Sequence, residues 1–121
     1  MQRVIFDSSF LLAVAESPTT WFEDIVEGMG RFEPVILECA EAELKLLSSG
    51  KGRKARLARV ALALAAGFSR APCGEAPVDD EIVSAALSTG AAVATVDGEL
   101  IRQLKAAHVK VVSLKKGRAS V

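Results

Sequence analysis

Short apolar runs alternate with longer stretches of helical periodicity along this chain. The apolar runs have the length of buried strands, whereas apolar residues three and four positions apart in the intervening stretches predict amphipathic helices. We expect strands at 3–6, 34–37, around 68–73, 91–95 and 109–114. We expect helices from residue 10 onward, then over 21–29, 38–49, 51–67, 80–88 and 99–107. Strands that alternate with helices predict a single three-layer α/β/α domain around a central, mostly parallel sheet.

Two of the expected helices carry further signals. Thr20 and Glu23 have the spacing of a capping box, in which side chains bond the free N–H groups at the start of the 21–29 helix. In the 51–67 helix, one face is apolar and the opposite face is basic. The expected inward residues are Leu57, Val60, Ala61 and Leu64, and the outward residues include Arg56 and Arg59. Because the last expected strand leads into a basic segment, we expect one domain over 1–116 and a short C-terminal tail over 117–121.

The composition supports one folded domain and adds a charge pattern that the net charge conceals. With 121 residues and 50% hydrophobic content, the chain can bury a core of its own. The 15 basic and 15 acidic residues cancel, so net charge alone indicates neither a nucleic-acid partner nor an acidic one. Along the chain, however, the sign alternates: acids dominate 1–44 and 75–99, whereas bases dominate 45–70 and 102–118.

The cysteine and histidine content argues against a zinc site. Cys39 and Cys73 are widely separated and His108 is the single imidazole, so we expect both cysteines to be small buried hydrophobic residues in a reduced, cytoplasmic protein. No segment has the roughly 20 apolar residues that a membrane span requires. Asp7 interrupts the apolar run that a signal peptide would need. We therefore expect no membrane partner.

Acidic residues are expected where the ends of the strands meet. In open parallel sheets, ligands bind beyond the carboxyl ends of the strands, near the point where the strand order reverses. Asp7 ends the first expected strand and Asp97 follows the fourth. Asp79 lies on the buried stripe at the head of the 80–88 helix, and Glu43 borders the buried stripe of the 38–49 helix. We expect these carboxylates to face one edge of the sheet.

Such a cluster of carboxylates cannot stay fully ionised without a bound cation. At separations of about 5 Å and an effective dielectric of about 20, each pair repels by about 3 kcal/mol, and the pairs together rival the stability of a whole domain. Protonation or a divalent cation must relieve the repulsion. Oxygen ligands without imidazole or thiolate suit Mg²⁺ or Mn²⁺. A site of this kind indicates phosphodiester hydrolysis.

Each acid also has an ordinary structural explanation. Asp79 could be the N-cap of its helix, which for that residue alone is the commoner role. Asp7 could cap the helix that follows it, and Asp97 could belong to an ordinary turn with the glycine after it. Glu43 could be a partly exposed acid at the edge of a stripe. The convergence of all four at one sheet edge favours a site over four unrelated roles.

The segments FDSSFLL, AEAEL, VDDEIVSAA and ATVDGELIRQLKAAHVKVV, in this order, resemble the PIN domain nucleases over nearly the whole chain. The resemblance implies a PIN-like fold in which four acids hold one or two divalent ions for cutting RNA. Matched residue by residue, these acids are Asp7, Glu43, Asp79 and Asp97, with Ser9 and Thr95 as supporting hydroxyls and Asp80 as a neighbour that contacts the metal through water. Ser9 and Val96 stand where the family often has Asn.

The expected function is a Mg²⁺- or Mn²⁺-dependent endoribonuclease that cuts single-stranded RNA. The T-x-D-x-E-L ending is most similar to the family branch that processes ribosomal RNA, although a toxin ribonuclease and a non-catalytic RNA-binding domain remain alternatives. The segment after residue 45 could contact phosphates, or it could equally be a solvated helix face. Its candidate RNA-binding residues are Lys51, Arg53, Lys54, Arg56 and Arg59. Besides RNA, a second copy of the chain, an antitoxin or a ribosome-processing partner could bind.

Overall fold

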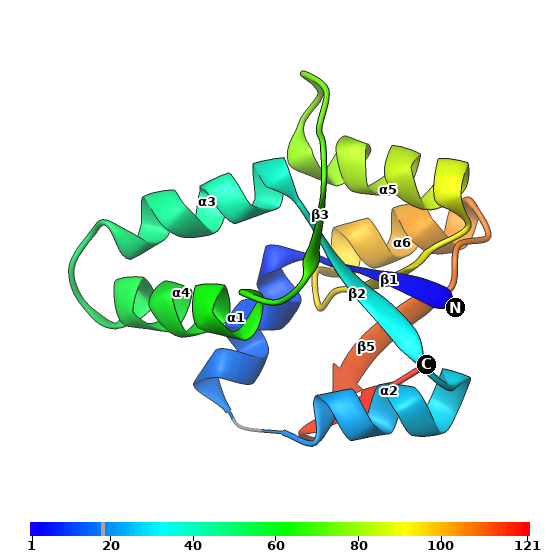
Figure 1. Cartoon of the computed structure of the whole chain (residues 1–121), viewed down its shortest axis with the longest axis horizontal. Helices are drawn as coiled ribbons and strands as arrows, with labels where there is room; N and C mark the ends of the chain where they lie inside the picture. Colours follow the sequence, from blue (N-terminus) through cyan, green and yellow to red (C-terminus); the bar gives the residue numbers. More distant parts are fainter. Residues whose placement is uncertain (18) are drawn as a thin grey trace.

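Within residues 1–17 and 19–121, which the computed structural model describes, six strands form one sheet in the order β3-β2-β1-β4-β5-β6 (Figure 1). The neighbouring strands are parallel except for β5 and β6, which are antiparallel. The elements are β1 (Gln2–Phe6), α1 (Ser8–Glu16), α2 (Trp21–Met29), β2 (Phe32–Leu37), α3 (Glu38–Ser48), α4 (Arg53–Leu64), β3 (Ser69–Ala71), α5 (Val78–Thr89), β4 (Ala92–Ala94), α6 (Gly98–Ala106), β5 (Val111–Lys115) and β6 (Arg118–Ser120). The predicted fold class is confirmed.

Helices cover both faces of the sheet because the chain reverses its direction across it. The chain first moves outward from β1 to β2 and β3 through α1 to α4; α5 then returns it past β1 to β4, and α6 leads to β5. Parallel crossovers are right-handed, so the reversal places α5 and α6 on the face opposite α1, α3 and α4. Contacts join α1, α3 and α4 to one another and α5 to α6, and Figure 1 shows the two groups apart.

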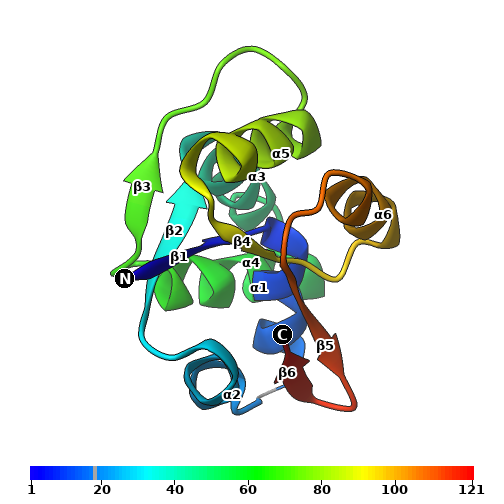
Figure 2. The same ribbon diagram turned by 90° about the vertical axis from the view of Figure 1, so that its right-hand side faces the viewer.

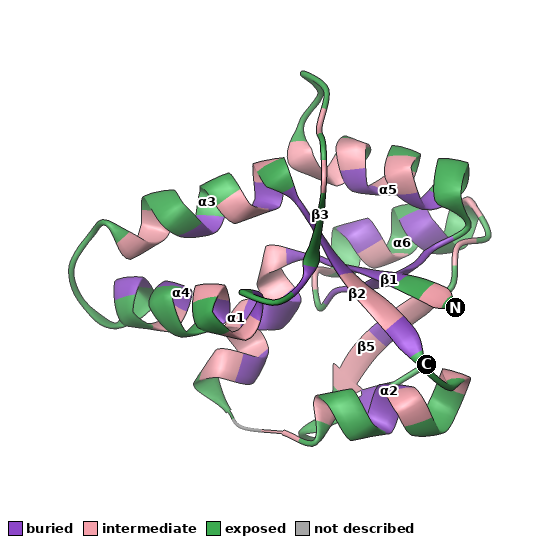
Figure 3. Ribbon diagram, in the orientation of Figure 1, coloured by how far each residue is buried: buried purple, intermediate pink, exposed green. Residues whose placement is uncertain are grey.

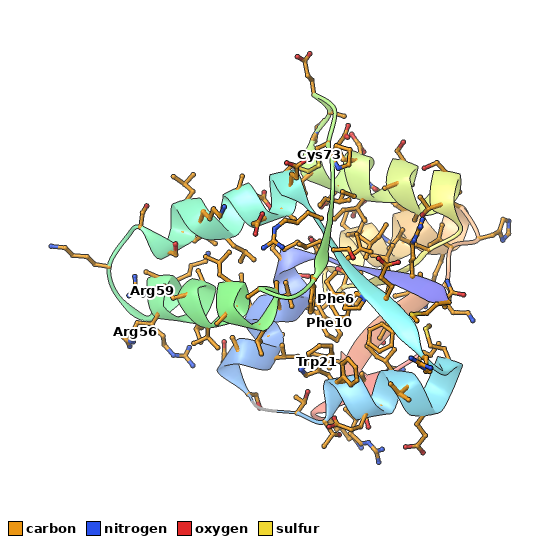
Figure 4. All side chains as sticks on the ribbon, viewed as in Figure 1. Phe6, Phe10, Trp21, Arg56, Arg59 and Cys73 are labelled. Carbon is orange, nitrogen blue, oxygen red and sulfur yellow. A yellow bond between two sulfur atoms is a disulfide. The ribbon has the colours of Figure 1, made fainter. Side chains whose placement is uncertain are left out.

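Phe6, the last residue of β1, is the centre of an aromatic cluster. Its ring centroid lies 5.0 Å from that of Phe68, 5.4 Å from that of Trp21 and 5.5 Å from that of Phe10. Figure 4 shows Phe6, Phe10 and Trp21 grouped beside α1. Phe6 is fully buried, and burial of such a side chain stabilises the fold by about 1.5–3 kcal/mol. The cluster therefore fixes the carboxyl end of β1, which carries Asp7.

The inward face of α4 consists of alanines, which corrects part of the predicted stripe. Ala55, Ala58 and Ala61 are buried, whereas Val60 is 46% exposed. Figure 3 shows the mixture of buried and exposed positions along this helix. Small side chains let α4 lie close to α1 and α3, which it contacts. The apolar pattern favoured Val60 because large apolar residues dominate such patterns and alanine contributes little to them.

Cys39 and Cys73 form a disulfide, so the prediction of two separate buried thiols is wrong. Their Cα atoms are 6.0 Å apart, and both residues are only half-buried. The pairing follows from the sheet register: Leu37 of β2 lies opposite Ala71 of β3, and each cysteine stands two residues further on. Spacing along the chain does not reveal this register. The disulfide joins the start of α3 to the segment that precedes α5.

A sixth strand extends the sheet where a basic segment was expected to follow the last strand. β6 pairs with β5 through Ser113 opposite Ser120. The connection is a two-residue turn, in which Lys116 has φ 51° and Gly117 has φ 78°. Positive φ values at both turn positions match the right-handed twist of antiparallel strands, and glycine adopts them at little cost.

The predicted capping box is wrong. The Thr20 hydroxyl donates to both carboxylate oxygens of Asp24, at 3.1 and 3.0 Å, and makes no cap bond to the backbone of α2. Asp24 also accepts from the N–H of Ala119 in β6, at 3.0 Å, and from the Arg118 guanidinium, at 3.2 Å. Burial raises the pKa of Asp24, but these hydrogen bonds outweigh it and hold the pKa below its ordinary value. Asp24 thus ties α2 to β6.

Candidate active site

Asp7 and Asp97 follow neighbouring strands at the point where the strand order reverses. β1 pairs with β2 on one side and with β4 on the other, with Phe6 opposite Ala94. The ladder extends one residue further, because the Asp7 N–H donates to the Ala94 carbonyl at 2.9 Å. The carboxyl ends of strands at such a reversal are where open α/β sheets bind their ligands.

Two hydroxyl groups hold the carboxylate of Asp7. Its Oδ2 accepts from Ser9 Oγ at 2.5 Å and from Thr95 Oγ1 at 2.8 Å. Asp7 occupies the N-cap position of α1 but makes no side-chain cap bond, so the capping explanation is wrong for this residue. Asp7 is 4% exposed. Within the described part of the chain, Oδ1 accepts no hydrogen bond from another side chain.

The same hydroxyls organise the backbone that leads to Asp97. Ser9 Oγ accepts from the Val96 N–H at 3.2 Å, and Thr95 Oγ1 accepts from the Asp97 N–H at 3.1 Å. Asp97 is itself the N-cap of α6: its Oδ1 accepts from the N–H of Glu99 at 2.9 Å and from that of Leu100 at 3.2 Å. The ordinary helix-start role of Asp97 is therefore present, and it fixes the direction of the carboxylate.

Asp79 lies in the first turn of α5 and does not cap it. The N-cap is Pro77 and the helix begins at Val78, two residues before the predicted start. Glu81 anchors the preceding loop by accepting from the N–H of Gly74 at 2.5 Å and from that of Ala76 at 3.2 Å. Burial raises the pKa of Asp79, and the negative charges of Asp7, Asp97 and Asp80 raise it further.

Glu43 approaches the other acids from α3. The residue as a whole is exposed, but its Oε1 lies 3.5 Å from Ser8 Oγ, which donates to it. Burial raises the pKa of Glu43, the charges of Asp7 and Asp79 raise it further, and the Ser8 hydroxyl opposes the shift. The structure thus brings together the predicted acids Asp7, Glu43, Asp79 and Asp97, with Asp80 exposed beside them.

The donor set suits a magnesium or manganese ion, but the spacing is wider than direct ligation requires. The edge offers carboxylate and hydroxyl oxygens and neither imidazole nor thiol, as Mg²⁺ and Mn²⁺ prefer. Among the residues that the structure describes, no three acidic, imidazole or thiol groups stand close enough to hold an ion together. Because Mg²⁺ keeps several waters and needs only one or two carboxylates, the arrangement fits a hydrated ion.

The candidate RNA-binding residues of α4 lie apart from this edge. Arg53 is ion-paired with Glu16 at 3.6 Å, and Arg59 donates to the Ser48 carbonyl at 2.6 Å. Figure 4 shows Arg56 and Arg59 toward the outer end of the α3–α4 pair. Arg53 thus pairs α4 with α1, and Arg59 bonds α4 to the end of α3.

Two features of the structure were missed from the sequence. Ser8, which bonds Glu43, carries no signal beyond its place in the FDSSFLL segment. Lys105, Lys110 and Lys115 line a groove beside α6. The available signal for the groove was that the charged residues over 102–118 are all basic.

One protein family and several solved structures match most of the chain. Residues 4–117 match the family described as PIN like domain. The chain is similar to a solved structure described as the PIN domain endonuclease Utp24, with 26% identity, coverage of 98% of this chain and 90% of that chain, and a TM-score of 0.80. No match was found among curated proteins. Every helix in the described part of the chain is too short or too polar to cross a lipid bilayer.

Two archaeal structures share the fold at lower identity. One is PAE2754 from Pyrobaculum aerophilum, with 18% identity, coverage of 91% of this chain and 83% of that chain, and a TM-score of 0.57. The other is a domain of a functionally unknown protein from Methanocaldococcus jannaschii, with 16% identity, coverage of 100% and 96%, and a TM-score of 0.61.

Proposed function

The chain belongs to the family of PIN-like domains, and on that premise we propose that its carboxylate edge is the active site of a divalent-cation-dependent endoribonuclease acting on single-stranded RNA. The observation that carries the proposal is the position of the acids: Asp7 and Asp97 follow neighbouring strands where the strand order reverses, and Glu43 bonds Ser8 beside them. Burial raises the pKa of Asp79, and the charges of Asp7 and Asp97 raise it further, as expected where carboxylates share an edge that a cation would neutralise. A purely structural helix start has no need of such crowding.

Asp7, Asp79 and Asp97 are the residues that would hold the ion, with Glu43 contributing charge from α3. When bound, a divalent ion supplies an activated water and neutralises charge that develops on the phosphate. The chain itself supplies orientation. Ser9 and Thr95 fix the Asp7 carboxylate through Oδ2. Backbone N–H groups of α6 fix Asp97 through Oδ1, which leaves Oδ2 of Asp97 for the ion.

We further propose that the protein processes RNA. The T-x-D-x-E-L ending, which is most similar to the family branch that processes ribosomal RNA, supports this role over that of a toxin. Producing the protein in growing bacterial cells separates the two roles. A toxin should arrest growth, and Asp7→Asn should remove the arrest; a processing enzyme of narrow target range should leave growth unaffected.

A cleavage assay on labelled single-stranded RNA tests the enzymatic proposal. The wild-type protein should cut RNA in Mn²⁺ or Mg²⁺ and stop when a chelator is added. Asp7→Asn and Asp97→Asn should abolish cutting, and both keep hydrogen-bond acceptors for the groups that hold them. Glu99→Gln is the matched control, because Glu99 is exposed on the same helix turn and paired with Arg102. Cutting that survives in chelator or in either Asn variant would refute the assignment, and RNA binding without cutting would favour the non-catalytic alternative.

A further inference from the structure

A groove of about 710 Å³ is lined by residues of α6, β5 and β6. Figure 2 shows α6 beside β5 at one end of the sheet. We call this groove the lysine groove. Its charged lining residues are Lys105, Lys110 and Lys115, and its apolar lining includes Val96, Ile101 and Leu114. The groove is distinct from the α4 surface that the sequence suggested for RNA.

The local sequence explains why this space is hollow. Ser113 and Lys115 are two residues apart on β5 and therefore face the same side of the sheet. Ser113 stands opposite Ser120 of β6, and two small side chains leave room where larger ones would fill it. The other wall is α6, where Ile101 and Lys105 are four residues apart and therefore share a face.

The charged side chains that line the groove are all basic. Among the described residues, no Asp or Glu lines it. Its three lysines are all exposed, and within the described part of the chain none of them is in an ion pair. Lysines without an ion-pair partner, set along an apolar groove, complement a ligand that carries both negative charges and flat apolar groups, as a nucleic-acid strand does.

One end of the groove reaches the carboxylate edge. Val96, which lines it, stands between Thr95 and Asp97, and its N–H bonds Ser9 of the site. From Asp97, α6 runs to Lys105 over eight residues, which corresponds to about 12 Å along the helix axis. A strand lying in the groove would therefore pass Val96, the residue next to Asp97 in the chain.

We infer that the lysine groove binds the RNA strand next to the position that is cut, with its lysines contacting phosphates and its apolar lining contacting bases. The inference rests on the proposed function, which makes RNA the substrate of the adjoining edge. Continuity with that edge favours RNA over an acidic protein partner. Because the apolar lining is aliphatic, binding depends on charge more than on base stacking and should tolerate different sequences.

Two charge-matched triple variants test the inference. One replaces Lys105, Lys110 and Lys115 by Gln; the other replaces Lys51, Lys54 and Arg56 of the α4 region by Gln. All six residues are exposed, so thermal melts should show both variants folded. Binding of fluorescently labelled single-stranded RNA is measured by anisotropy over a range of salt concentrations, in chelator, so that the result does not depend on cleavage.

The groove variant should bind RNA up to about 100-fold more weakly at 0.1 M salt. The slope of log binding constant against log salt concentration should be flatter by up to about 2, because each phosphate contact on a single strand contributes about 0.7 to that slope. The α4 variant should change less. Crosslinking of RNA that contains 4-thiouridine should label residues within 96–115. Equal loss in the two variants, or groove-variant binding within twofold of wild type, would overturn the inference. Poly-glutamate that competes as well as RNA would reassign the groove to an acidic protein.

These outcomes separate the inference from the proposed function. Groove-dependent binding without any cleavage would refute the enzyme but keep the groove as an RNA-binding surface. Cleavage by a protein whose groove variant binds and cuts like wild type would refute the groove and keep the enzyme.

Discussion

Replacing Thr95 by Val removes one hydroxyl from the centre of the site and keeps the shape of the side chain. Thr95 is fully buried; its hydroxyl donates to Asp7 at 2.8 Å and accepts from the Asp97 N–H at 3.1 Å. A hydrogen bond to a charged group contributes about 1.5–3 kcal/mol, and a buried N–H left without an acceptor costs about 1–3 kcal/mol. Because Asp97 is only half-buried and water can reach it in part, we expect a loss of about 2–4 kcal/mol.

The expected loss is large enough to measure by thermal unfolding in chelator. For a chain of 121 residues, the unfolding entropy is about 0.25 kcal/mol per kelvin, so the melting temperature should fall by about 8–16 °C. Thr95→Ser is the control, since it keeps the hydroxyl and loses one methyl group, at a cost of about 1 kcal/mol. In the cleavage assay the Val variant should lose about 10–100-fold in rate, as outer-shell partners typically do. A Val variant as stable as the Ser variant would refute this account of how Asp7 is held.

Three further perturbations test the electrostatics and the disulfide. In chelator at neutral pH, Asp79→Asn should melt at a higher temperature than wild type, and the advantage should shrink as pH falls through the raised pKa of Asp79, because the wild type then becomes neutral as well. Added Mn²⁺ should stabilise wild type by about 2.7 kcal/mol at one hundred times its dissociation constant and the variant much less; equal shifts would remove Asp79 from the site. Reduction of the Cys39–Cys73 disulfide, which spans 34 positions, should destabilise the protein by about 3–4 kcal/mol, and a Cys39→Ser variant should show no response to reductant in the same melts. Asp24→Asn should lower the melting temperature at neutral pH. The difference from wild type should vanish in acid, because the stability that a lowered pKa provides is lost as pH falls through that pKa. A difference that persists in acid would show that packing and not charge is responsible.

The elements and the convergence of acids were predictable because their signals are local. A short apolar run such as 3–6 marks a strand wherever it pairs, and the acid that follows it must lie at the carboxyl edge. The alternation of strands and helices then fixes a parallel sheet, and helical periodicity places Asp79 toward the buried side of its helix. The α5 start was misplaced by two residues because Pro77 is the N-cap, and this left open a capping role for Asp79 that the structure excludes.

The errors share a dependence on partners distant in the sequence. The disulfide requires the register of β2 against β3, which no single segment contains. Thr20 has a capping-box spacing, but Asp24 competes for its hydroxyl, and Asp24 is in turn oriented by Ala119 from 95 positions away. Val60 was wrongly placed inward. The inward face of α4 is lined by alanines because neighbouring helices approach it closely, and the distance between helices depends on the tertiary structure and not on the local sequence.

The bond between Thr95 and Asp7 joins residues 88 positions apart, and this separation determines when the proposed site can exist. Contacts so distant along the chain form late, because the intervening chain must first be ordered or closed into a loop. During translation, Asp7 leaves the ribosome long before β4 and Asp97 have been made. An incomplete chain therefore carries isolated carboxylates instead of a cation site. RNA beside the nascent chain, including the message being read, is exposed to the proposed hydrolytic centre only once β4 and Asp97 have been synthesised and folded against β1.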